Sequence, residues 1–240
     1  MIKQRKIGKH TLYFDDVRHR FWDEHEDGLI SVTTVTGIVD KSRPLIFWAV
    51  NLAKQYLLDI VENQMVPVTT EHILTAARQH TIKKEEAADI GTEIHKWVSA
   101  WIQGQKPEIP DNEKIRQGID AFLKFQNEYK VKWLQSEEIV GSFKHHFAGI
   151  MDAVGKIGKD LVLIDFKSSN AIYPEMYLQV AGYQMAWEEE TKKKLAYRII
   201  ARFGKDDGEF EYRKLDDKKA DAEAFLAALK LKLRMKELTK

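Results

Sequence analysis

One apolar segment carries two aspartates whose spacing would let them bind a cation, and a lysine close to them. The segment Phe147–Lys167 is rich in Ile, Val, Leu and Phe on both sides of Gly158, which predicts a β-hairpin. With glycine as the first residue of a two-residue turn, the register places Asp152 directly opposite Asp165. Lys167 follows two residues later and therefore points to the same face of the strand as Asp165.

The neighbours of these aspartates predict that the two strands are central and covered on both faces, since they are Ala153, Val154, Val162, Leu163 and Ile164. Like charges directly opposite in a sheet are destabilising, so the two carboxylates need a cation or a shared proton. A hard divalent metal such as Mg²⁺ suits carboxylate oxygens. Lys167 could then hold an attacking water or stabilise charge on a phosphate.

Two alternatives to this hypothesis remain open. The hairpin could lie at the surface with an ordinary Asp–Lys pair. A one-residue slip of the register would place the aspartates on opposite faces of the sheet.

Two predicted helices carry further polar candidates. In Ile90–Gln103 the apolar residues repeat at helical spacing, and His95 lies at the edge of that stripe. A helix that Pro174 opens carries Gln179 and Tyr183, which are four residues apart and so share a face. A helical histidine taken alone is more often structural than catalytic, and Q-x-x-x-Y taken alone is commonplace.

The segments GTEIH, GIMD, IDFKSS and Q-x-x-x-Y occur in that order, and together they resemble the PD-(D/E)XK nuclease superfamily. The resemblance is to its RecB-like branch, which includes phage-type exonucleases and the mitochondrial genome maintenance exonuclease. It implies Asp152, Asp165, the Phe166 carbonyl and His95 as metal ligands and Lys167 as the catalytic lysine, with Ser168, Gln179 and Tyr183 in substrate-binding or supporting roles. Met151 stands where the superfamily name has proline.

Two further positions gain interest from this resemblance. Relatives often carry a glutamate one strand before the first aspartate, and Glu137 fits by spacing better than Glu138; that both are solvated or paired with lysines stays open. Ser31 begins an SVT element that supports the site in relatives, and the alternative is that Ser31 caps a helix.

The predicted fold is α/β, a mixed central β-sheet with helices on both faces, as in a restriction-endonuclease-like core. We expect one nuclease domain over residues 1–240, with a helical elaboration over about 31–130, a catalytic core over about 131–215 and a C-terminal helix over 216–239. Pro44 opens a helix to about Val61, in which Trp48 is assigned to a core rather than to base stacking. Thr70 caps the next helix, for which a break is expected near Thr81.

Composition limits the compartment and the partners. The chain has 240 residues and a net charge of +1, so DNA contact must come from a local basic groove. It has no cysteine, which excludes disulfides and the four-cysteine iron–sulfur cluster of several RecB-like relatives. No apolar run reaches the roughly 20 residues of a membrane span, and the N-terminus lacks the apolar part of a secretory signal, so a cytoplasmic, bacterial or phage-encoded protein is expected.

The expected function is Mg²⁺-dependent hydrolysis of DNA, with Mn²⁺ able to substitute. The substrate is expected to be single-stranded DNA or DNA with free ends, cut by an exonuclease in recombination, repair or phage DNA processing. An endonuclease, a preference for RNA, a non-catalytic DNA-binding module that keeps the fold, and a hydrolase of small phosphate esters remain open. The sequence names no protein partner.

Overall fold

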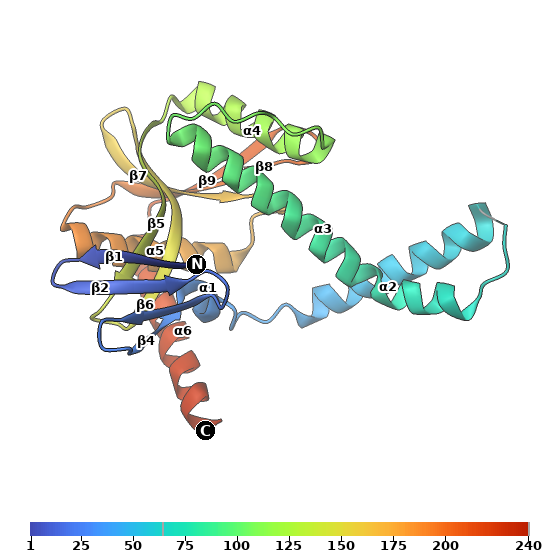
Figure 1. Ribbon diagram of the computed structural model, residues 1–240, viewed down its shortest axis with the longest axis horizontal. Coiled ribbons are helices and arrows are strands. Elements are labelled where there is room, and N and C mark those ends of the chain that lie inside the picture. The colour runs from blue at the N-terminus through green and yellow to red at the C-terminus, as the bar shows by residue number, and fades with distance from the viewer. Residues whose placement is uncertain (64, 240) are drawn as a thin grey trace. The chain divides into compact units, whose positions relative to one another are not determined.

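The computed structural model describes residues 1–63 and 65–239, and Figure 1 labels most of its elements. The chain divides into two compact units, Met1–Ile38 with Ile94–Lys240, and Val39–Glu93. The second unit falls within the predicted helical elaboration. The expectation of a single nuclease domain over residues 1–240 stays a prediction.

The first unit is built on a mixed β-sheet. Counted over the described residues, nine strands pair in the order β1-β2-β3-β4-β6-β7-β8-β9, with β5 also paired to β6. The β4–β6 and β7–β8 pairs are parallel and the others are antiparallel. The strands are β1 Ile2–Ile7, β2 His10–Asp15, β3 Arg20–Asp23, β4 Gly28–Ser31, β5 Lys132–Ser142, β6 Phe147–Ile157, β7 Asp160–Lys167, β8 Tyr197–Phe203 and β9 Phe210–Leu215.

The β6–β7 hairpin has the predicted register. Ile157 pairs with Asp160 next to the turn, and the ladder continues to the pair of Ala153 with Ile164. Gly158 has φ +61°, a left-handed value that the first position of a type II′ turn requires and that glycine adopts without strain. The two strands are central in the sheet and largely buried, as their apolar sequence predicts.

Helices cover both faces of this sheet. Ile200 of β8 belongs to the core that includes α5 (Pro174–Thr191) and α6 (Lys218–Leu238). Phe203, three residues on and so on the opposite face, packs against Phe122 and Phe125 of α4 (Glu113–Tyr129). Figure 1 shows α4 and α5 on the two sides of the strands. The predicted α/β class, a mixed sheet with helices on both faces, is confirmed.

The C-terminal part of α3 (Thr70–Ile102) packs against α4 through a stripe of apolar residues. Ile94, Trp97 and Val98 are buried, as the helical spacing predicts. Gly118 of α4 allows the close approach, because a Cβ there would lie 2.4 Å from Cδ1 of Ile94. This contact fixes the helical turn that carries His95.

The second unit corrects two expectations. It consists of α2 (Ser42–Leu58), the π-helical turn Asp59–Asn63 and residues 70–93 of α3. Trp48 is 38% exposed, and none of the described residues 42–58 of α2 is buried, so the core assignment is wrong. A unit this small has too few neighbouring elements to cover a helix.

The expected break near Thr81 is also wrong, because α3 is a single helix from Thr70 to Ile102. Residues 70–102 contain no proline, and the segment 76–88 around Thr81 is rich in Ala, Lys, Glu and other good helix formers, so nothing interrupts the hydrogen-bond ladder there. The cap lies one residue earlier than expected: Oγ1 of Thr69 accepts a hydrogen bond from the backbone N–H of His72. Over the described residues, no helix combines the length and apolarity needed to cross a bilayer.

Candidate metal centre

Three adjacent strands bring three carboxylates to one level of the sheet. Asp152 and Asp165 follow directly on the last paired residues of the β6–β7 ladder. On the other side of β6, Glu137 of β5 lies between the residues that pair with Ala153 and Met151, and so lies opposite Asp152. The row Glu137, Asp152, Asp165 is therefore a consequence of strand order and register.

His95 completes a group of metal-ligating side chains. Ligand atoms of His95, Glu137 and Asp152 all lie within 4.8 Å of one another. Nδ1 of His95 is 3.6 Å from Oδ1 of Asp152, and the other carboxylate oxygen, Oδ2, accepts a hydrogen bond of 2.6 Å from the backbone N–H of Phe166. One imidazole nitrogen and two carboxylates can hold a divalent cation such as Mn²⁺ or Mg²⁺.

Glu137 has an unusual backbone for a strand residue. Its φ is +55°, in the left-handed region that few residues other than glycine adopt, and such strain clusters at functional sites. Its neighbour Glu138 instead forms an ion pair of 3.3 Å with Arg5 of β1. The two glutamates thus have different surroundings, and Glu137, which the spacing favours, is the one beside Asp152.

Asp165 and Lys167 form a buried ion pair next to this group. Nζ of Lys167 is 2.5 Å from Oδ2 of Asp165, and the two side chains are 17% and 1% exposed. Among the described residues, the other oxygen, Oδ1 of Asp165, has no hydrogen-bond partner. Asp165 is not one of the three residues within 4.8 Å of one another, and its Oδ2 contacts the lysine instead. An unpartnered buried carboxylate oxygen is costly, and a bound cation would satisfy it.

The carboxylates repel one another and differ in proton affinity. Burial, aided by the charge of Asp152 and opposed by Lys167, raises the pKa of Asp165 to about 6. Glu137 is an exposed residue, but partial desolvation of its carboxylate and the charge of Asp152 raise its pKa to about 7. Burial acts in the same direction on Asp152, but the charges of His95 and Lys167 and the Phe166 N–H outweigh it, so the pKa of Asp152 is lowered. The metal-free site therefore holds protons on some carboxyl groups near neutral pH.

The neighbouring carboxylates favour the charged forms of His95 and Lys167. Burial acts to lower the pKa of His95, but the adjacent Asp152 carboxylate outweighs it and raises that pKa. The pKa of Lys167 is likewise raised by Asp165 and Asp152 against the effect of burial. In the metal-free protein the charge of Lys167 partly neutralises the carboxylates, and protonation of His95 adds to this effect. A cation binding at His95 would have to displace the imidazole proton.

Gln179 and Tyr183 of α5 form a hydrogen-bonded pair close to the carboxylates. Nε2 of Gln179 donates to the Tyr183 hydroxyl at 3.0 Å, and Tyr183 is buried. Burial and the charges of Asp165 and Asp152 raise the pKa of Tyr183, so the phenol stays protonated. The ring lies directly on β6, because a Cβ at Gly149 would come within 2.6 Å of Cε1 of Tyr183.

The remaining predicted residues have less direct positions. Ser31 is the N-cap of α1 (Val32–Thr36), where its Oγ accepts a hydrogen bond from the Thr34 N–H at 3.0 Å, so the structure gives it the capping role. Ser168 follows Lys167 at the end of β7 and is half-buried. The Phe166 ring packs near His95 and among aromatic side chains of the α4 face, namely Phe122, Trp133 and Phe203.

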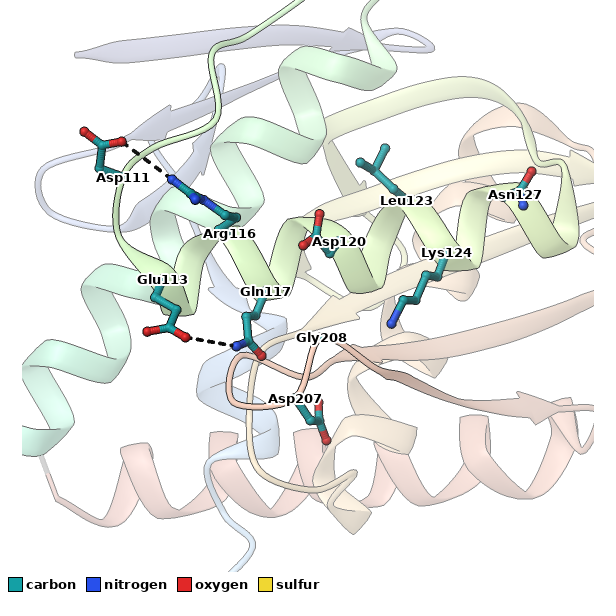
Figure 2. A pocket seen from close by; sticks show the side chains of 10 residues that line it. All are labelled: Asp111, Glu113, Arg116, Gln117, Asp120, Leu123, Lys124, Asn127, Asp207 and Gly208. Carbon is teal, nitrogen blue, oxygen red and sulfur yellow. Dashed lines mark hydrogen bonds and ion pairs between the residues drawn. The ribbon is translucent and has the colours of Figure 1, made fainter.

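A separate pocket lies between α4 and the loop joining β8 to β9, as Figure 2 shows. It has a volume of about 790 Å³ and includes none of the metal-ligating group. Its lining is polar and of mixed charge, with an ion pair of 3.6 Å between Arg116 and Asp111 and a hydrogen bond of 3.5 Å from Gln117 to Glu113. The clustered carboxylates, not this pocket, carry the chemistry that the site can perform.

No protein-family model and no curated protein sequence matches the chain. Among solved structures, it is similar to SSO0001 (10% identity, TM-score 0.39, covering 86% of this chain and 75% of that one). It is also similar to an alkaline exonuclease, LHK-Exo, from Laribacter hongkongensis (14% identity, TM-score 0.32, covering 64% and 89%). For LHK-Exo in complex with dAMP the values are 15% identity, TM-score 0.38, and coverage of 88% and 92%.

Proposed function

We propose that this chain is a metal-dependent deoxyribonuclease that hydrolyses phosphodiester bonds, acting as an exonuclease on single-stranded DNA or on DNA with free ends. The observation that carries the proposal is the grouping of His95, Glu137 and Asp152 within 4.8 Å, beside the buried Asp165–Lys167 pair. The order of these residues in the chain also fits the resemblance of the sequence to RecB-like nucleases. Together they support a hydrolytic reaction at a phosphate.

The residues present fit a divalent cation. His95, Glu137 and Asp152 would hold it, and Asp165 and the Phe166 carbonyl would complete the ligand set. Oδ1 of Asp165 supports this set, since it is buried and has no hydrogen-bond partner among the described residues, while Lys167 contacts only Oδ2. Mg²⁺ is the expected ion and Mn²⁺ the expected substitute, because the donors are mostly oxygen.

In the reaction, the bound cation would supply a water of lowered pKa and polarise the scissile phosphate. Lys167 is charged and lies on the strand beside Asp165, so its ammonium would orient the attacking water and stabilise charge on the phosphate oxygens. Asp165 holds that ammonium in place. Gln179 would contact a phosphate or a neighbouring base, and the neutral Tyr183 would keep Gln179 oriented through their hydrogen bond.

The proposal is tested by removing the lysine. Lys167→Ala should reduce cleavage of a fluorescent oligonucleotide in Mg²⁺ by about 100-fold or more, the size of effect seen when a charge-stabilising group is removed. Lys159→Ala, which removes an exposed lysine from the turn of the same hairpin, is the matched control and should cleave at the wild-type rate. Equal rates for the two variants would refute the role of Lys167. Binding of DNA without cleavage under every metal would identify a non-catalytic module.

A further inference from the structure

The N-terminal strand lies beside the metal-ligating group and is basic. In β1, Lys3, Arg5 and Ile7 alternate and therefore share one face. Ile7 is buried in the cluster that contains Ile139, and Arg5 donates a hydrogen bond to the Ile139 carbonyl. These contacts fasten β1 against β5 just after Glu137.

Arg5 forms ion pairs with side chains of the protein itself. Its guanidinium is 3.3 Å from a carboxylate oxygen of Glu138 and 2.7 Å from one of Glu190, and its side chain is only 19% exposed. A half-buried arginine with two carboxylate partners is not free to bind a ligand. Its function here is to hold β1 in position.

Lys3 is the next residue on that face, and it is available. Its side chain is 51% exposed, and its ion pair with Asp16, at 4.0 Å between half-exposed groups, contributes little. Arg5, two residues along the same face of β1, contacts Glu138 and the Ile139 carbonyl, which follow directly on Glu137 in β5. An exposed ammonium group therefore lies on the face of β1 that packs against β5 next to the metal-ligating group.

We propose that Lys3 binds a backbone phosphate of the DNA strand, adjacent to the phosphate that is cleaved. This inference rests on the proposed nuclease function. A nucleic acid that approaches the site meets the carboxylates of Glu137, Asp152 and Asp165, and a lysine at their edge offsets that repulsion as a point charge. A small phosphate ester has no second phosphate, so Lys3 makes the site selective for a polymer.

The experiment compares Lys3→Ala with Lys3→Arg and with Lys9→Ala. Lys9 is the matched control, since it lies in the exposed turn between β1 and β2, about 20 Å from Lys3 along the strand. Each variant is assayed for cleavage of a single-stranded oligonucleotide and of bis(4-nitrophenyl) phosphate in Mn²⁺. Binding of the oligonucleotide is measured in EDTA at several salt concentrations, and thermal melts check that each variant is folded.

Lys3→Ala should raise KM for the oligonucleotide about five- to tenfold with kcat within twofold of wild type. It should also reduce the slope of log K against log salt by about 0.7, the value for one phosphate contact on a single strand. Lys3→Arg should restore both quantities, Lys9→Ala should change neither, and turnover of the small ester should be the same in all four proteins.

Several results would overturn the inference and leave the nuclease proposal intact. These are a wild-type KM and salt slope in Lys3→Ala, an equal loss in Lys9→Ala, or a matching loss on the small ester. The first shows that Lys3 makes no contact, the second that only overall charge matters, and the third that Lys3 acts on the reacting groups. A wild-type protein that neither binds nor cleaves DNA would overturn the proposed function and the inference together.

Discussion

Replacing Asp165 by asparagine should stabilise the metal-free protein most at high pH. Asp165 is 1% exposed, and its pKa is raised from 3.8 to about 6 by burial and by the charge of Asp152. A shift of that size corresponds to roughly 3 kcal/mol of destabilisation at pH 7.5, where the carboxyl group is ionised. In the proposed function a bound cation would offset this cost.

The sign follows from the direction of the shift. A carboxyl group whose pKa is raised in the folded state destabilises the protein above that pKa, and the penalty fades as the pH falls through about 6 towards 3.8. We compare the free energy of unfolding of Asp165→Asn with that of wild type. The gain in the variant should therefore be larger at pH 7.5 than at pH 5, by roughly 1 to 2 kcal/mol. The attraction of Lys167 already contributes to that pKa, so the change with pH measures the net free-energy cost of ionising the carboxyl group.

The assay is urea unfolding in EDTA at pH 5, 6, 6.8 and 7.5, followed by circular dichroism. Asp160→Asn removes a carboxylate from the turn end of the same hairpin and provides the baseline for a lost charge. A difference between Asp165→Asn and wild type that is constant with pH would refute the reasoning. A difference that grows as the pH falls would show that the attraction to Lys167 exceeds the effect of burial.

Three further predictions follow from the same geometry. Glu137→Gln should raise the Kd for Mn²⁺ at least tenfold in calorimetry, and Glu138→Gln, its matched control, should leave it within twofold; equal losses would remove Glu137 from the ligand set. Mn²⁺ affinity should increase from pH 6 to pH 8, with protons released on binding. The raised pKa values of His95 and Glu137 favour protons on the groups that would bind the cation. A pH-independent Kd would contradict this. Gly149→Ala should lower the free energy of unfolding by about 1–3 kcal/mol, since its Cβ would overlap Cε1 of Tyr183; an unchanged melting temperature would show that the ring moves freely.

The part of the site that the sequence predicts best is the β6–β7 hairpin. Gly158 limits the turn, and the turn length sets the register, so the neighbouring positions of Asp152 and Asp165 follow from local rules. The buried stripe that places His95 follows in the same way from helical spacing. Both features depend on residues close together in the chain.

Glu137 was preferred to Glu138 only by its spacing in the resemblance, because the local rules do not decide between them. Strand alternation shows that only one of Glu137 and Glu138 can face the site, but the left-handed backbone at Glu137 interrupts that alternation. The partner that engages Glu138 is Arg5, more than a hundred residues away in the sequence. The choice between the two glutamates therefore depends on tertiary contacts that no local pattern contains.

The sequence does not predict the N-terminal strand β1, and it assigns Trp48 wrongly to a core. β1 is an edge strand in which Lys3, Arg5 and Lys6 replace the apolar residues by which strands are recognised, and such charges are common at sheet edges. Trp48 has the spacing of a buried residue, but α2 belongs to a small unit that does not bury it. Hydrophobic spacing predicts a helix in both the buried and the exposed case, so it cannot distinguish them.

The most direct test uses end-labelled linear and circular DNA, single- and double-stranded, incubated with Mg²⁺, Mn²⁺ or EDTA and with wild type or Asp165→Ala. The account predicts metal-dependent loss of linear DNA with circles spared, no activity in EDTA, and no activity in a folded Asp165→Ala protein. Cut circles would replace the exonuclease with an endonuclease that uses the same site. Wild-type turnover by Asp165→Ala, or cleavage that persists in EDTA, would contradict the central claim.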